Sequence, residues 1–267
     1  MANAVELIVD GAPVTSVDLA HVALVNYGAY TSFGVEQGGV RGLDLHLARL
    51  EAEAVELFGK AVGEPRLREL MRGAVADRDA CWLRVSLFSP DISPRTPDWR
   101  GAPRVMIAVS PPPAPFADGA RLQLQTYVRE AAHLKHVGTF GLVRARRLAR
   151  DAGFDDALFQ DQQGWVSEGS LWNIGFTAGD EVVWPQGPKL AGVAQALLQQ
   201  GMDGFGLNPR AAPVHVSDLA KFDGAFLCNS ATPACAVAAI GERAYATPPD
   251  LIDRLRAAWT SNPVQPI

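Results

Sequence analysis

The sequence has few cysteines, no long apolar run and no excess of positive charge. Its three cysteines among 267 residues lack the spacing of a metal site or a disulfide framework, which favours reduced thiols in a cytoplasmic protein without a bound metal. No stretch reaches the roughly 20 apolar residues that span a membrane. A formal net charge of −5 argues against general binding to nucleic acid or anionic membranes. The Walker loop and the dinucleotide-binding fingerprint are also missing.

The N-terminal part combines strand and helix patterns. Runs of β-forming residues predict strands, and leucines that recur every three or four positions from Leu43 to Leu57 predict an amphipathic helix. Pro65 is a good first-turn residue for a second helix. The expected strands are residues 4–9, 21–36, 81–88 and 104–109, and the expected helices are 43–60 and 65–75.

The clearest linker is the proline-rich segment 110–115, because proline stiffens an extended chain and blocks helices and central strands. We place the domain boundary there, with an N-terminal domain at 1–113 and a C-terminal domain at 114–267. Strands and helices without regular alternation predict an α+β fold in two parts. In the second part, strands are expected at 121–128, 157–160, 165–168, 173–176, 181–184, 212–216, 225–228 and 236–240, and helices at 138–152, 193–200 and 251–259.

Lys135 lies just before the expected helix at 138–152. Its neighbours Leu134 and Val137 are apolar, so its amine can be partly desolvated. Desolvation lowers the pKa of an amine and makes it a nucleophile, the condition for Schiff-base chemistry. A solvated surface lysine fits the local pattern as well.

A series of ordered motifs surrounds Lys135 and extends over nearly the whole chain. Together they resemble the class IV aminotransferase family, the fold-type IV pyridoxal-phosphate enzymes that include branched-chain and D-amino-acid aminotransferases and aminodeoxychorismate lyase. The resemblance implies a smaller N-terminal α/β domain, a larger β-rich C-terminal domain that carries Lys135 and Glu168, and pyridoxal 5'-phosphate between them. The motifs are His46-Leu47-Ala48-Arg49-Leu50, Ala149-Arg150-Asp151-Ala152-Gly153, Asp156-Ala157-Leu158-Phe159, Glu168-Gly169-Ser170, Asn173 and Leu190-Ala191-Gly192-Val193-Ala194.

Three residues match the principal cofactor contacts of the family. Lys135 matches the lysine that holds the cofactor as a Schiff base and then moves a proton between substrate and cofactor. Glu168 matches the carboxylate that pairs with the pyridine nitrogen and so keeps the ring an electron sink. Arg49 matches the arginine that binds the phosphate group. The resemblance thus implies a catalytic role for Lys135 and binding roles for the other two.

Further phosphate contacts are implied at a helix start and at a loop. The backbone amides of Val193 and Ala194 match the phosphate-binding turn, where the family usually has Ile-Thr. The loop Ser230-Ala231-Thr232 matches a segment that touches phosphate and substrate, and either hydroxyl can make the contact.

The resemblance also indicates substrate residues and departures from the family. Tyr30 matches an aromatic residue that lines the pocket, and Arg84 matches an arginine that accepts an acidic co-substrate. An internal Asp or Glu would equally satisfy Arg84, since a charge in an apolar strand needs a partner. Thr31, also assigned to the substrate site, stands where the family usually has glutamate. Phe140 stands where branched-chain enzymes carry a tyrosine that contacts the cofactor.

The leading hypothesis is a pyridoxal-phosphate-dependent aminotransferase that exchanges an amino group between an amino acid and a 2-oxo acid. An aminodeoxychorismate lyase, which eliminates pyruvate through the same cofactor, is the alternative; Thr31 favours it, whereas Arg84 favours transamination. A non-catalytic cofactor-binding protein is a remote third interpretation, because Lys135, Glu168 and Arg49 are all present. The resemblance also implies a homodimer.

Overall fold

The computed structural model describes residues 5–76 and 78–267, and packing divides them into two units. The first unit extends to Pro113 and also includes Leu134–Gly138 and Val264–Ile267, and the rest of the chain forms the second unit. Lys135 therefore packs with the first unit, although the sequence assigned it to the C-terminal domain. The expected strand at 4–9 begins one residue outside the described part.

The first unit contains an antiparallel sheet of seven described strands in the order β16-β4-β3-β5-β6-β1-β2. The last strand of the chain, which the sequence did not predict, closes one edge of this sheet by pairing with β4. The strands are β1 (Glu6–Val9), β2 (Ala12–Pro13), β3 (Ala29–Glu36), β4 (Gly39–Arg41), β5 (Ala80–Phe88), β6 (Arg104–Ser110) and β16 (Val264–Pro266).

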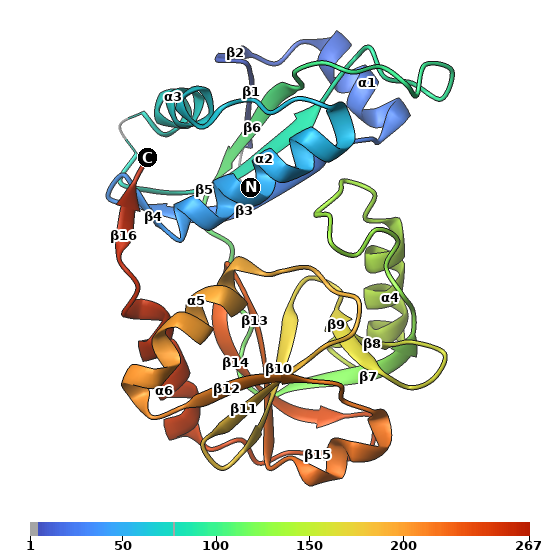
Figure 1. Ribbon diagram of the computed structural model, residues 1–267, viewed down its shortest axis with the longest axis vertical. Coiled ribbons are helices and arrows are strands. Elements are labelled where there is room, and N and C mark those ends of the chain that lie inside the picture. Colours follow the sequence, from blue (N-terminus) through green and yellow to red (C-terminus); the bar gives the residue numbers. More distant parts are fainter. Residues whose placement is uncertain (1–4, 77) are drawn as a thin grey trace. The chain divides into compact units, whose positions relative to one another are not determined.

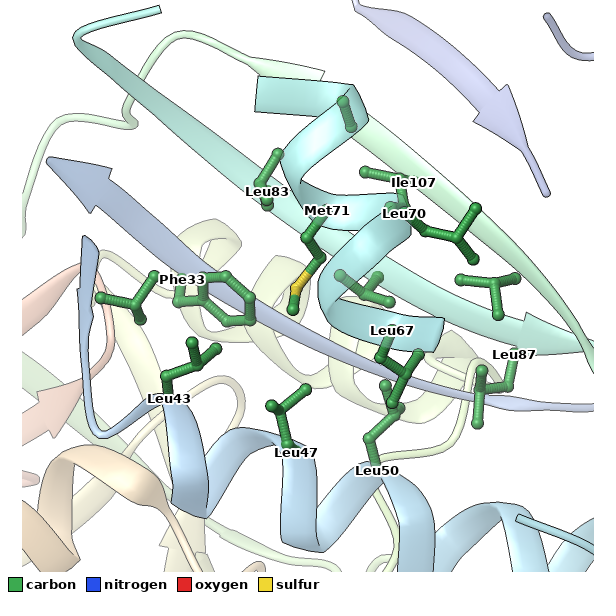
Figure 2. Close-up of a cluster of buried hydrophobic side chains, with 14 of the residues drawn as sticks. Phe33, Leu43, Leu47, Leu50, Leu67, Leu70, Met71, Leu83, Leu87 and Ile107 are labelled. Carbon is green, nitrogen blue, oxygen red and sulfur yellow. The ribbon is translucent and has the colours of Figure 1, made fainter. Parts of the chain in front are cut away.

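Two amphipathic helices, α2 (Leu43–Phe58) and α3 (Glu64–Val75), cover one face of this sheet (Figure 1). Leu47 and Leu50 of α2 meet Phe33 of β3 in a buried core, to which α3 adds Met71 (Figure 2). The leucine spacing therefore predicted α2 correctly. The helix ends because Gly59 takes the left-handed conformation, with a φ of 78°, and its N–H donates to Val55 O.

The expected strand over 21–36 is wrong for its first residues, which belong to helix α1 (Ser16–Val25). Thr15 and Asp18 form a reciprocal capping box that starts this helix. Only Asp18 is buried along the helix, so its apolar residues make no buried stripe. The β-forming residues within 21–25 resemble a strand in sequence, but the cap decides the local structure.

A short segment around Lys135 extends the sheet of the first unit at the start of β3. Tyr30 N–H donates to Lys135 O and Val137 N–H donates to Gly28 O, both at 2.9 Å. Gly28 has a φ of 156°, and a Cβ there would overlap the carbonyl oxygen of Leu87. Only glycine lets the neighbouring strand approach this closely.

The second unit contains a mixed sheet with the order β12-β11-β10-β13-β14-β7-β8-β9, and β15 pairs with β14. The pairs β11–β12, β14–β7 and β7–β8 are parallel, and the other pairs are antiparallel. The strands are β7 (Ala120–Thr126), β8 (Asp156–Gln160), β9 (Val166–Gly169), β10 (Asn173–Ala178), β11 (Glu181–Pro185), β12 (Asn208–Ala212), β13 (Gly224–Asn229), β14 (Thr232–Ile240) and β15 (Arg243–Ala244).

The expected strand at 212–216 is displaced, because β12 ends at Ala212. Pro213 follows directly and has no N–H to donate. His215 then caps the short 3-10 helix η2 (Val216–Lys221) by accepting from Ser217 N–H. Local capping chemistry therefore overrides the apolar pattern.

Three helices pack on the sheet of the second unit, together with the 3-10 turn η1 (Met202–Phe205). Ala145 and Ala149 of α4 (Phe140–Asp151) face Phe159 of β8, whereas α5 (Val193–Gly201) and α6 (Pro249–Thr260) lie side by side (Figure 1). No helix in the described part of the chain is long and apolar enough to cross a membrane.

We expect Gly28→Ala to destabilise the first unit by about 2 kcal/mol or more, because the new Cβ overlaps the Leu87 carbonyl. The Val137 amide, which donates to Gly28 O, should then exchange its hydrogen faster. Urea unfolding and amide exchange measure the two effects. Gly73→Ala is the matched control: it lies in α3 with open space around it, and we expect it to stabilise by about 0.5–1 kcal/mol. Equal effects of the two changes would contradict this account of Gly28.

Candidate active site

Lys135, Tyr30 and Arg84 form one cluster in the first unit. The Tyr30 ring is buried, with Arg84 Cζ 3.6 Å and Lys135 Nζ 4.8 Å from its centroid. Arg84 Nε also donates to Ser86 Oγ at 3.4 Å. No Asp or Glu among the described residues forms an ion pair with Arg84, so an internal carboxylate does not satisfy its charge there. The cluster therefore places an amine and a guanidinium around one aromatic ring, and the guanidinium can receive an acidic ligand.

Arg49 and Thr31 lie together between α2 and β3. Arg49 Nη2 donates to Thr31 Oγ1 at 3.0 Å, and Thr31 Oγ1 lies 2.6 Å from His46 Nδ1. Burial, with smaller contributions from the charges of Arg49 and Lys135, lowers the pKa of His46 well below its usual value. His46 is thus neutral near pH 7, and the sequence predicted no role for it beyond its motif.

Glu53 connects the two groups in the first unit. Its carboxylate is buried, accepts the backbone N–H of Lys135 at 2.6 Å and lies 4.0 Å from Arg49 Nε. One carboxylate thus fixes the backbone of the lysine and neutralises the arginine. The sequence places Glu53 one turn after Arg49, but nothing in it indicated contact with residue 135.

Glu168 of β9 is a buried carboxylate in the second unit with donors at both oxygens. Arg129 Nε donates to Oε1 and Leu190 N–H donates to Oε2, each at 3.0 Å. Arg129 is itself buried. Burial lowers the pKa of Lys189, and the charge of Glu168 opposes that shift. The sequence missed Arg129, whose position just after a strand gives no sign of its partner 39 residues later.

The turn after Glu168 is fixed by a buried aspartate. Asp156 Oδ1 accepts from Ser170 Oγ at 2.6 Å, and its Oδ2 accepts from Trp172 Nε1 at 3.1 Å. The Trp172 ring lies where a Cβ of Gly169 would be. The Gly-Ser part of the motif is therefore a local structural requirement. Gly169 leaves room for the indole ring of Trp172, and Ser170 holds the turn through its hydrogen bond to Asp156.

A second close approach fixes the loop before α5. Asn173 Nδ2 donates to Leu190 O at 3.1 Å, and a Cβ at Gly192 would overlap the Asn173 amide oxygen. α5 then starts at Val193 without a side-chain cap. The first-turn amides, including those of Val193 and Ala194, lack acceptors within the helix and form an anion-binding geometry.

The loop between β13 and β14 separates its two hydroxyl groups. Asn229 Oδ1 accepts from Ala231 N–H at 3.0 Å and Thr232 N–H at 2.9 Å. Thr232 is buried and its Oγ1 accepts from Phe116 N–H at 2.9 Å. Ser230 is half-buried, and its hydroxyl has no hydrogen-bond partner in the described part of the chain. Ser230 is thus better placed than Thr232 to receive a ligand.

Phe140 begins α4, and its side chain is 79% exposed. Because this side chain is exposed, phenylalanine, which lacks the hydroxyl of the tyrosine in branched-chain enzymes, leaves no buried gap in the second unit.

The first unit has an antiparallel sheet and carries Lys135, and the second unit has a mixed sheet and carries Glu168, whose carboxylate accepts from two donors. Together they define a two-unit α+β protein of the kind expected from the sequence. Residues 28–240 match the sequence model of class IV aminotransferases, and the chain belongs to this family. The family resemblance and the fold are thereby confirmed.

Solved structures share this fold at low sequence identity. Branched-chain amino acid aminotransferase from T.th., complexed with N-(5'-phosphopyridoxyl)-L-glutamate, has a TM-score of 0.85 at 19% identity, over 100% of this chain and 99% of that chain. A hypothetical aminotransferase from Mycobacterium tuberculosis in its PLP-bound form has a TM-score of 0.77 at 21% identity, over 96% and 99%. Branched-chain aminotransferase from Thermoproteus uzoniensis with norvaline has a TM-score of 0.79 at 20% identity, over 95% and 93%. No curated protein matches the chain by sequence.

We expect Arg129→Met and Glu168→Gln each to lower the free energy of unfolding by about 3–5 kcal/mol, because each leaves an uncompensated buried charge or donor. The double variant should lose clearly less than the sum, with a coupling energy of about 1–3 kcal/mol. Urea unfolding of the four proteins measures the cycle. Additive losses would show that the two side chains do not stabilise one another.

Proposed function

We propose that this protein is a pyridoxal-phosphate-dependent aminotransferase that exchanges an amino group between an amino acid and a 2-oxo acid. The observation that carries this proposal is the cluster of Lys135, Tyr30 and Arg84. It combines a nucleophilic amine, an aromatic wall and a guanidinium without a carboxylate partner among the described residues. Membership of the class IV aminotransferase family supports transamination as the reaction type.

The side chains fit pyridoxal phosphate by charge. Arg49, the first-turn amides of α5 and the Ser230 hydroxyl suit a phosphate dianion, and Glu168 suits a protonated pyridine nitrogen. When bound, this cofactor supplies an electron sink for negative charge at the substrate Cα. Arg129 and Leu190 N–H stabilise the charged form of Glu168, so this carboxylate can keep a pyridine proton in place.

Lys135 is the residue to which we assign the covalent and proton-transfer roles. Its Nζ would hold the cofactor covalently and, once the substrate amine has released it, would take the proton from the substrate Cα and return it to C4′ of the cofactor. The hydrogen bonds to Tyr30 and Glu53 hold its backbone, so the amine moves only through its side-chain torsions.

Arg84 indicates the class of one substrate. A half-buried guanidinium with only Ser86 Oγ and the Tyr30 ring as its partners in the described part can bind a side-chain carboxylate in a forked geometry. We therefore infer that an acidic amino acid is one amino donor. The phosphopyridoxyl-L-glutamate complex of the T.th. enzyme supports glutamate as the first compound to test.

We expect Lys135→Ala to lower turnover by about a thousandfold or more, because the nucleophile and the base are lost together. The protein should also lose the visible absorption of lysine-linked cofactor while still binding pyridoxamine phosphate. Absorbance titration and steady-state assays measure these effects. Lys60→Ala is the control, since Lys60 is exposed in the first unit. Full activity of Lys135→Ala would overturn the mechanism.

A half-reaction screen tests the reaction itself. Mixing the pyridoxal-phosphate form with glutamate should convert it to the pyridoxamine form, whereas a lyase would release pyruvate from aminodeoxychorismate without accumulating that form.

We expect Arg84→Leu to raise the half-saturating glutamate concentration about 10–100-fold, through loss of a charged contact. The half-saturating concentrations of free leucine and alanine as amino donors should change little. An equal effect on acidic and neutral amino acids would exclude Arg84 from carboxylate binding.

A further inference from the structure

Thr31 lies at the centre of a buried chain of polar side chains in the first unit. It belongs to β3 and has no exposed surface. Its Oγ1 lies 2.6 Å from His46 Nδ1 and 3.0 Å from Arg49 Nη2. His46 and Arg49 are three residues apart on α2 and so project from the same side of the helix. This placement argues against the substrate contact expected for Thr31 from the sequence.

The chemistry of the three groups fixes the direction of both hydrogen bonds. Arginine only donates, so Thr31 Oγ1 accepts from Arg49. The hydroxyl proton of Thr31 then goes to His46 Nδ1, because the described residues bring no other acceptor within hydrogen-bonding distance of Thr31 Oγ1. His46 is therefore the tautomer with its proton on Nε2. The lowered pKa of His46, which burial and the charges of Arg49 and Lys135 cause, keeps the ring neutral and able to accept.

We propose that Thr31 and His46 are positioning residues that orient the Arg49 guanidinium to bind the phosphate of the cofactor, an inference that rests on the function proposed above. The guanidinium is planar, and its fork must match the phosphate oxygens. The Thr31 hydroxyl fixes one terminal nitrogen, and Glu53 lies 4.0 Å from Nε on the adjacent turn. A guanidinium already held in one orientation loses less conformational freedom on binding.

A merely structural role for Thr31 predicts a different result. Thr31→Val keeps the shape of the side chain but removes the hydroxyl, whereas Thr31→Ser keeps the hydroxyl and removes a methyl group. If the hydroxyl only stabilises the fold, the valine variant should weaken every ligand equally. If it orients Arg49, only ligands that carry the phosphate should bind more weakly.

The test measures the dissociation constants of pyridoxamine phosphate and pyridoxamine for the full-length apoprotein. Neither compound has an aldehyde, so the reaction with Lys135 does not contribute. We expect Thr31→Val to weaken pyridoxamine phosphate about tenfold and pyridoxamine less than about twofold, and Thr31→Ser to restore phosphate binding to within about twofold. Equal weakening of both ligands by Thr31→Val would overturn the inference. Wild-type protein that binds the two compounds equally would instead contradict the proposed function, and with it the inference.

His46 provides a second pair of variants in case the valine protein does not fold. His46→Asn can present an amide oxygen where Nδ1 accepts, whereas His46→Leu removes the acceptor. We expect His46→Leu to lower the preference for pyridoxamine phosphate over pyridoxamine about tenfold, and His46→Asn to retain most of it. The same preference in both variants would show that His46 does not act through Thr31.

Discussion

The candidate site of the first unit depends on how the backbone around Lys135 is held. Three hydrogen bonds join this segment to distant parts of the unit: Tyr30 N–H to Lys135 O, Val137 N–H to Gly28 O, and Lys135 N–H to Glu53. Each satisfies a backbone group that would otherwise lose its contact with water. Because the lysine backbone is fixed, its side chain can lie beside the Tyr30 ring in a defined position.

The buried charges of both units are likewise satisfied and held in position by their partners. Glu168 accepts from two donors, and Glu53 accepts from Lys135 N–H and forms an ion pair with Arg49, so neither carboxylate is buried without compensation. Such groups add little to net stability compared with a well-packed apolar core. Their consequence is geometric: the donor that contacts each carboxylate is held in place before any ligand arrives. This is the preorganisation that ligand-binding sites require.

The sequence predicted the elements that periodicity controls and missed features that local capping or tertiary contacts control. The leucines of α2 and the core of the first unit followed their helical spacing. The predictions for α1 and β12 were wrong because the cap at Thr15 starts α1, and because β12 ends before Pro213, which has no N–H to donate. The family motifs identified Lys135 and Glu168 as candidates, but they gave no sign of Arg129. Its position after a strand acquires meaning only when the fold brings a carboxylate to it.

Thr31 shows why a departure from a family pattern must be interpreted through its surroundings. In the sequence, threonine instead of the usual glutamate favoured the lyase alternative, and Thr31 was assigned to the substrate site beside Tyr30. In the strand, however, successive side chains point to opposite faces. Tyr30 meets Arg84 and Lys135, whereas Thr31 meets His46 and Arg49. A glutamate there would be a second carboxylate in a region where Glu53 already lies near the guanidinium. A hydroxyl instead accepts from the arginine and donates to a neutral imidazole, so one small group satisfies both neighbours without adding charge.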